Sequence, residues 1–165
     1  MGGDAFEDVL GANEEYARGF ALAGLSGRAA KGLAVLTCID SRIEPLAMLG
    51  LSPGDAKILR NAGARVDAGV LATLALAHRL LGVTRAMVVA HTDCRLSVAG
   101  EAQLHEAMAA AGDPDPRDLS FAVGAGREET VRHDVAEIRS SPHLAGLEAA
   151  GFLYDVETGR LRPIC

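Results

Sequence analysis

The stretch Gly32-Leu33-Ala34-Val35-Leu36-Thr37-Cys38-Ile39-Asp40-Ser41-Arg42 decides the fold predicted for this chain. Its apolar first part predicts a buried strand over 32–36, because short apolar runs bounded by turn signals are typical of such strands. A thiol, a carboxylate and a guanidinium follow directly. In open α/β sheets, ligands bind outside the carboxyl ends of the strands. The stretch therefore predicts chemistry at a sheet edge, and extended backbone to residue 42 would put Cys38, Asp40 and Arg42 on one side.

The rest of the chain alternates between predicted strands and helices. Strands are predicted over 56–60, 85–90, 151–156 and 160–164, and helices over 4–20, 44–49, 68–81, 97–111 and 127–139. This alternation indicates an α/β fold with a mostly parallel central β-sheet flanked by helices, in a single domain over 1–165. The helix over 68–81, with Asp67 as its N-cap, is apolar around most of its circumference, so we expect it to be buried.

Residues 1–31 are predicted to form an N-terminal helical arm and linker. Apolar residues recur there at helical spacing, and a polar, glycine-broken segment over 24–32 separates the helix from the first strand. An amphipathic helix joined so loosely to its own core has an apolar face left to cover. We therefore expect it to pack on a partner subunit.

Composition narrows the possible classes of function. The chain of 165 residues has a formal net charge of -6 and a pI near 5.3, which argues against nucleic acid as a partner, because clustered Lys and Arg bind phosphate backbones. The N-terminus does not resemble a secretory signal, and the longest apolar stretch, 70–81, is too short to span a bilayer. The odd number of cysteines does not suggest a disulfide framework. We therefore expect a cytoplasmic protein without a membrane partner.

A second polar segment, His91-Thr92-Asp93-Cys94, follows the predicted strand over 85–90 as Cys38 follows the first strand. Two thiolates and an imidazole are ligand types that zinc prefers, so Cys38, His91 and Cys94 predict a zinc site. A catalytic zinc site keeps its fourth position for water, whereas a structural site closes with four protein ligands. Asp40 is either that fourth ligand or the partner of Arg42, since a guanidinium holds a carboxylate with two hydrogen bonds.

Three segments together resemble the signature segments of the β-class carbonic anhydrases, and the short length resembles the compact bacterial branch of that family. The segments are Cys38-Ile39-Asp40-Ser41-Arg42, Arg60-Asn61-Ala62-Gly63 and His91-Thr92-Asp93-Cys94. The resemblance implies an α/β fold around a parallel sheet and a homodimer or a dimer of dimers. It also implies zinc held by Cys38, His91 and Cys94, with Asp40 and Arg42 as a catalytic dyad.

The activity implied by this resemblance is the reversible hydration of carbon dioxide to bicarbonate and a proton. Zn2+ would acidify the attacking water and Asp40 would accept its proton. In some members of the family the aspartate leaves its arginine for the metal, and Asp40 has the same option. Ala62, Gly63 and Val66 are candidates for the substrate pocket by their position after the second strand, although ordinary core packing explains them equally well.

Two other functions stay open at this point. Members of the same fold hydrolyse carbonyl sulfide or carbon disulfide, and a homologue without catalysis would be a zinc-binding structural or regulatory dimer. One departure from the family pattern bears on activity, because Arg95 stands where the family usually has glycine directly after the second cysteine. We expect Arg95 to face solvent, since an arginine in the cleft would bind an anion or obstruct entry.

Overall fold

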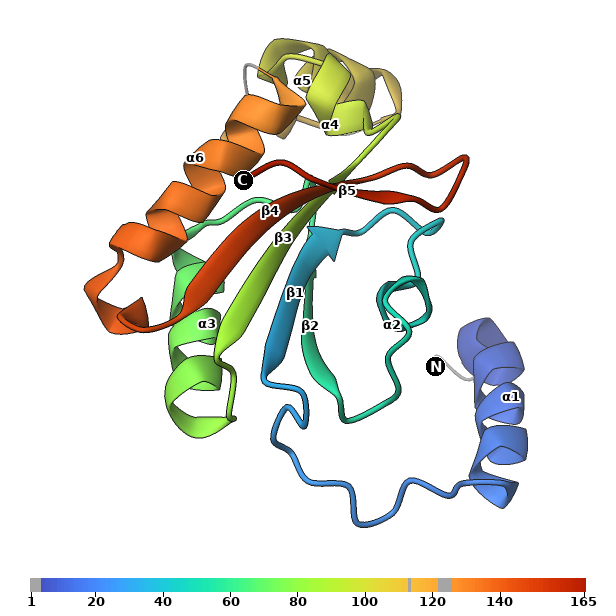
Figure 1. The fold of residues 1–165 in the computed structure, drawn as a ribbon. Coiled ribbons are helices and arrows are strands. Elements are labelled where there is room, and N and C mark those ends of the chain that lie inside the picture. The colour runs from blue at the N-terminus through green and yellow to red at the C-terminus, as the bar shows by residue number, and fades with distance from the viewer. Residues whose placement is uncertain (1–3, 113, 122–125) are drawn as a thin grey trace.

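The structure is a computed structural model that describes residues 4–112, 114–121 and 126–165. In this part of the chain, five strands form one sheet in the order β2-β1-β3-β4-β5 (Figure 1). The strands are β1 (Leu33–Cys38), β2 (Ala56–Asn61), β3 (Arg85–His91), β4 (Glu148–Tyr154) and β5 (Leu161–Pro163). Only β5 runs antiparallel to its neighbour. The prediction of a mostly parallel sheet is confirmed.

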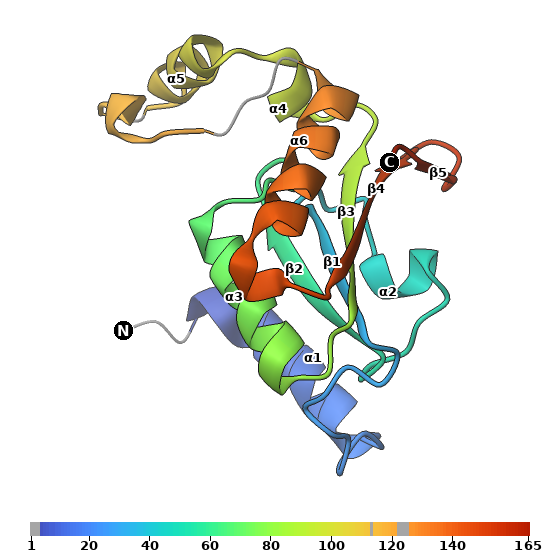
Figure 2. The same cartoon turned by 60° about the vertical axis from the view of Figure 1, so that its left-hand side comes forward.

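Helices cover both faces of the sheet. They are α1 (Glu7–Arg18), α2 (Pro45–Met48), α3 (Ala68–Leu80), α4 (Arg95–Val98), α5 (Glu101–Ala110) and α6 (Arg127–Ser140). Helices α3 and α6 lie on one face and α2 lies on the other (Figures 1 and 2). The single helix predicted over 97–111 is wrong, because the backbone is extended at Ala99 and Gly100 and divides it into α4 and α5. In the described part of the chain, every helix falls short of the length and apolar character needed to cross a membrane.

Side chains of β1 alternate between two core layers. Ala34 and Leu36 pack with residues of α3 and α6, whereas Leu33 and Val35 pack on the opposite face, near α2. All six residues of β1 are buried. A strand covered on both faces has no polar side, which is why its sequence reads as one apolar run.

Helix α6 lies close against β4 because Gly151 has no side chain. A Cβ atom at this position would lie 2.4 Å from Val131 Cγ1 and 3.0 Å from Cys165 Sγ. The first distance is far below the contact distance of two non-bonded carbon atoms. Glycine at position 151 therefore sets how closely α6 approaches the sheet.

Helix α3 is only partly buried, so the prediction of a fully buried helix is wrong. Asp67 caps it as expected, because its side chain accepts a hydrogen bond from Val70 N at 2.8 Å. Leu74 is 1% exposed and faces the core, whereas Leu76 is 52% exposed on the other side. The core lies against only one face of α3, and on the other side the short segment Pro142–Leu144 lies beside the helix without burying Leu76.

Helix α1 stands apart from the sheet (Figure 1) and buries none of its own residues in the described chain. An exposed apolar stripe, called the α1 stripe below, consists of Val9, Leu10 and Tyr16 of the helix with Phe6 and Phe20 just beyond its two ends. The expectation that this helix packs on a partner subunit stays a prediction.

Truncation of the two leucines of α3 tests this burial. We expect Leu74→Ala to lower the free energy of unfolding by about 2–5 kcal/mol, because it leaves a cavity in the core. Leu76→Ala is the matched control on the same helix and should change it by no more than about 0.5 kcal/mol. Urea unfolding followed by circular dichroism measures both, and equal losses would contradict the burial described for α3.

Candidate metal centre

The structure brings the three predicted ligands together. Cys38 ends β1, His91 ends β3, and Cys94 is the N-cap residue of α4. Because β1 and β3 are parallel neighbours, their carboxyl ends meet at one edge of the sheet. All three residues are at most 5% exposed. One donor atom from each lies within 4.8 Å of the others, which is close enough for a single ion to bind all three.

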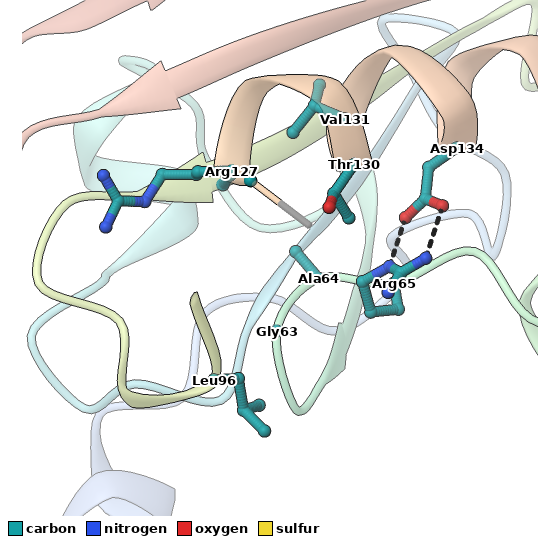
Figure 3. A pocket seen from close by; sticks show the side chains of 10 residues that line it. Gly63, Ala64, Arg65, Leu96, Arg127, Thr130, Val131 and Asp134 are labelled. Carbon is teal, nitrogen blue, oxygen red and sulfur yellow. Dashed lines mark hydrogen bonds and ion pairs between the residues drawn. The ribbon is translucent and has the colours of Figure 1, made fainter. Parts of the chain in front are cut away.

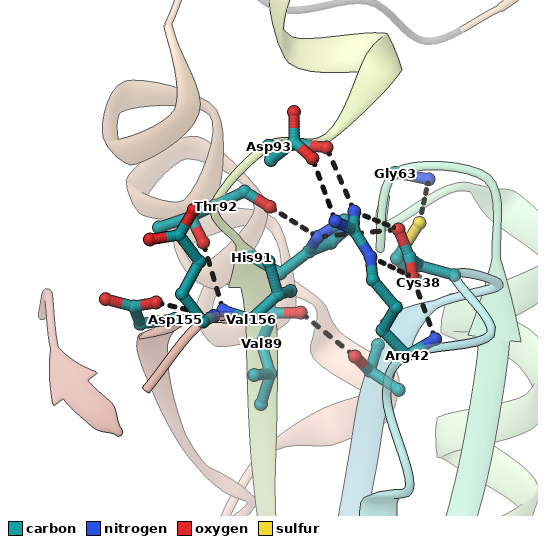
Figure 4. Close-up of polar contacts among 12 residues, drawn as sticks. Cys38, Arg42, Gly63, Val89, His91, Thr92, Asp93, Asp155 and Val156 are labelled. Carbon is teal, nitrogen blue, oxygen red and sulfur yellow. Dashed lines mark hydrogen bonds and ion pairs between the residues drawn. The ribbon is translucent and has the colours of Figure 1, made fainter. Parts of the chain in front are cut away.

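A hydrogen bond at one ring nitrogen of His91 leaves the other nitrogen suited to bind a metal. Its Nδ1 lies 2.8 Å from the backbone oxygen of Thr92, so Nδ1 carries the proton and donates it (Figure 4). Burial lowers the pKa of His91 and keeps the ring neutral. The Nε2 atom is buried and has no hydrogen-bond partner among the described residues. An unsatisfied buried acceptor is costly, and a metal ion would satisfy it.

The donor set fits zinc. Two sulfur atoms and one neutral imidazole are the ligands of known Cys2His zinc sites. The sulfur of Cys38 also lies 3.4 Å from the backbone N–H of Gly63, which donates to it (Figure 4). Within the described residues, no carboxylate joins Cys38, His91 and Cys94 as a fourth donor.

Asp40 is paired with Arg42 by three hydrogen bonds. Its Oδ2 accepts from Arg42 Nη2 at 2.7 Å, and its Oδ1 accepts from Nε at 3.0 Å and from the backbone N–H at 2.9 Å. These bonds hold the pKa of the Asp40 carboxyl well below its usual range, so it is ionised at neutral pH. Asp40 was expected to be either a fourth metal ligand or the partner of Arg42, and in the structure it is the partner of Arg42. Its Oδ2 still lies only 3.9 Å from His91 Nδ1.

The route by which Asp40 and Arg42 meet differs from the one expected. Extended backbone through residue 42 is wrong, because β1 ends at Cys38 and the chain then turns. The turn is closed by the backbone N–H of Ile43, which donates to the Asp40 carbonyl at 3.1 Å. Aspartate favours such turns because its side chain binds the backbone two residues on. The pair is therefore a product of the turn and not of strand alternation.

Asp93 lies between His91 and Cys94 in the sequence and was not among the predicted site residues, but its contacts make it one. Its Oδ2 accepts from Arg42 Nη1 at 2.8 Å, and its backbone oxygen accepts from Arg42 Nη2 at 3.2 Å. The Asp93 backbone is left-handed, with φ 53°. Arg42 thus joins the segment after β1 to the segment after β3. The sequence held one hint of this contact. Arginine has five N–H donors, and the Asp40 carboxylate alone cannot accept from all of them, so Arg42 needed a second acceptor.

Arg60 is a second site residue to which no role was assigned from the sequence, although it belongs to the second signature segment. Its Nε donates to the Cys38 carbonyl at 2.9 Å and its Nη2 donates to the Asp40 carbonyl at 2.7 Å. The parallel register places Arg60 beside Thr37, so its side chain reaches the turn that follows β1. Arg60 therefore fixes the backbone on both sides of Ile39.

The three residues predicted for the substrate pocket lie in different surroundings. Ala62 is exposed, and Val66 packs against the main core cluster. Gly63 lines a small pocket at the end of α6 (Figure 3). The other residues lining this pocket include Arg65, Leu96, Arg127, Thr130 and Asp134. The assignment of Ala62, Gly63 and Val66 to a substrate pocket stays a prediction.

Arg95 is exposed on the first turn of α4. Its backbone is helical and is not one of the left-handed positions of the described chain that favour glycine. The structure thus has no steric need for glycine directly after Cys94. This agrees with the expectation that Arg95 faces solvent.

Fold and site together define a class of α/β protein with a buried Cys2His metal centre at the carboxyl edge of a mostly parallel sheet. Residues 33–111 match the family model described as carbonic anhydrase. The chain is 31% identical to beta-carbonic anhydrase 1 of Mycobacterium tuberculosis over 163 residues, which covers 96% of each protein. The chain belongs to the β-carbonic anhydrase family.

Two further relatives are a carbonic anhydrase of known structure and a carbon disulfide hydrolase. The crystal structure of a carbonic anhydrase from Streptococcus mutans superposes with a TM-score of 0.88 at 35% identity and covers 97% of both chains. A carbon disulfide hydrolase from an Acidianus species is 29% identical over 152 residues, covering 78% of this chain and 74% of the relative. The relatives of this chain therefore include proteins named for two different substrates.

Metal content tests the candidate ligands. The purified protein should hold roughly one zinc ion per chain, and Cys38→Ser, His91→Ala or Cys94→Ser should each remove most of it, because three protein ligands are the minimum of known sites. Cys165→Ser is the matched control, since this cysteine is exposed at the end of the chain. Elemental analysis after dialysis measures the content. Full zinc occupancy in Cys38→Ser would contradict the assignment.

Proposed function

We propose that this protein catalyses the reversible hydration of carbon dioxide to bicarbonate and a proton. The observation that supports it best is the buried cluster of Cys38, His91 and Cys94 beside an ionised Asp40. The three residues would hold Zn2+, which supplies an acidified water as the nucleophile. The carbonic anhydrases among the relatives support the same substrate.

The residues around the cluster would orient the attacking water and hold one another in place. Asp40 Oδ2 accepts one hydrogen bond from Arg42 and Oδ1 accepts two, so Oδ2 keeps the freer position for a proton from the attacking water. Arg42 keeps the carboxylate ionised and aimed. Asp93 and Arg60 hold this pair from the β3 segment and from β2. Asp40 is therefore the proposed hydrogen-bond acceptor that orients the attacking water, and Arg42, Asp93 and Arg60 are its positioning groups.

Neutralising Asp40 tests its role. We expect Asp40→Asn to lower kcat/KM for carbon dioxide hydration by about 100-fold or more, because the loss of correct orientation at the reacting atoms costs about that much. Zinc content should not change. Asp115→Asn is the matched control, since Asp115 pairs with Arg117 through the same pattern of bonds on the surface. Stopped-flow hydration assays measure both variants, and full activity in Asp40→Asn would remove Asp40 from the mechanism.

Hydrolysis of carbon disulfide or carbonyl sulfide is the second candidate, because a carbon disulfide hydrolase is among the relatives. These molecules are linear like carbon dioxide and present an electrophilic carbon to the same nucleophile. Parallel assays with the three substrates separate the candidates by kcat/KM. A zinc-loaded protein inactive on all three would instead be a silent dimer, against which the intact Asp40–Arg42 pair argues.

We also propose that the protein is a homodimer, or a dimer of dimers, in which the N-terminal arm of residues 1–31 packs on a second copy. The support is the apolar stripe of α1, whose residues are 49–62% exposed in the single chain. A stripe of this kind costs free energy in water until another surface covers it. A cytoplasmic location fits cysteines that form no disulfide, as Cys38, Cys94 and Cys165 do not, since a reducing compartment keeps thiols reduced.

Changing the α1 stripe tests the assembly. We expect Val9→Gln with Leu10→Gln to shift the protein toward the monomer, because both side chains belong to the stripe. Asp8→Asn with Glu15→Gln is the control pair, because these two residues are seven apart and lie on the other side of the same helix, and it should leave the mass unchanged. Light scattering coupled to size-exclusion chromatography measures the mass. An unaltered oligomer in the first variant would argue against packing through α1.

A further inference from the structure

We propose that Asp134 and Arg65 are positioning residues for the metal centre, which hold the backbone N–H of Gly63 on the sulfur of Cys38. The inference rests on the proposed function in so far as Cys38 is a metal ligand. It assigns a role to a buried ion pair that lies outside the ligand set and outside the Asp40–Arg42 pair. The four residues involved come from β1, from the loop after β2 and from α6.

Asp134 is a charged residue buried in the core. It lies on α6 and is 1% exposed. Its Oδ2 and Oδ1 accept from Arg65 Nε and Nη2 at 2.8 and 3.1 Å (Figure 3), and Oδ2 also accepts from the backbone N–H of Val66 at 3.0 Å. His133 Nδ1 lies 3.7 Å from Oδ1. Moving a carboxylate from water into the core costs free energy, and pairing with an arginine often only offsets that cost. A gain in stability therefore does not explain this ion pair by itself, and we look for a role in positioning.

The contacts of Asp134 are made with the loop that follows β2. Asn61 closes this loop, since its Nδ2 donates to the Arg65 carbonyl at 2.7 Å and its Oδ1 accepts from Arg65 N at 2.8 Å. Inside the loop, Gly63 and Ala64 are both left-handed, with φ 84° and 57°. A left-handed alanine is strained and persists only where its surroundings hold it in place. The two hydrogen bonds from Arg65 to Asp134 and the one from Val66 N to Asp134 keep the loop in this strained conformation.

The strained loop aims one N–H at the metal centre. Gly63 N lies 3.4 Å from Cys38 Sγ, a normal distance for a hydrogen bond to sulfur. A hydrogen bond to a thiolate draws charge from the sulfur, so less of it is given to a bound metal. The metal then keeps more positive charge and polarises its remaining ligand more strongly. The Asp134–Arg65 pair thus acts on the metal through the backbone of Gly63.

Cadmium NMR tests this chain of contacts directly. The protein is loaded with 113Cd, a tetrahedral thiolate-binding stand-in for zinc. A hydrogen bond from an amide to a metal-bound sulfur transmits a coupling between the amide proton and 113Cd. We expect this coupling at Gly63 in the unaltered chain. We expect its loss or strong reduction in Asp134→Asn, which offers Arg65 only one acceptor oxygen, and in Arg65→Lys, which lacks the two-pronged guanidinium.

Glu128→Gln is the matched control, because it removes an ion pair between the same helix and Arg162 without touching the loop. Its coupling should equal that of the unaltered chain. If Asp134→Asn does not fold, Arg65→Lys, which keeps the positive charge opposite Asp134, decides alone. Failure to bind cadmium would overturn the metal site and with it the proposed function. Binding without a coupling at Gly63, or a coupling unchanged in the folded variants, would overturn this inference only.

Discussion

The parallel pairing of β1 with β3 is the constraint on which the metal centre depends. Its register places Thr37 beside Val89, so that Cys38 and His91 leave the sheet at one edge. A shift of one residue in such a pair moves every side chain of a strand to the opposite face. It would exchange the two core layers that β1 serves and carry the Cys38 sulfur away from the His91 ring. Core packing and metal binding are therefore fixed by the same set of backbone hydrogen bonds.

Features controlled by short stretches of sequence could be predicted, and those that depend on distant partners could not. The apolar runs of β1 and β3 and the polar residues after them were sufficient to predict the sheet and the cluster. The exposure of Leu76 was not, because it depends on which neighbours α3 has in the fold. The same holds for Arg60 and Asp134, since their roles appear only when β1, β2 and α6 meet. The turn after Cys38 was missed because aspartate suits a turn as well as the end of a strand.

Two arginines beside the metal centre, Arg42 and Arg60, are directed at oxygen atoms. Arg60 binds two carbonyl oxygens, and Arg42 is shared between Asp40 and Asp93. The donor that reaches the Cys38 sulfur is instead a neutral backbone amide. A guanidinium beside a thiolate would compete with a cation for its charge, because the attraction between unlike charges is strong where water is excluded. A neutral amide draws less charge from the sulfur than a guanidinium would, so the sulfur still binds a metal ion while its donation is reduced.

Gly151 shows how far the requirements of such a site extend. The space it leaves lets α6 lie against β4, and α6 carries the carboxylate of Asp134 to the loop after β2. In a saturation-mutagenesis screen for activity, this glycine should therefore score as essential although it bears no functional group. Its intolerance would be a matter of volume alone. A residue in contact with neither metal nor substrate can thus be as restricted as a ligand.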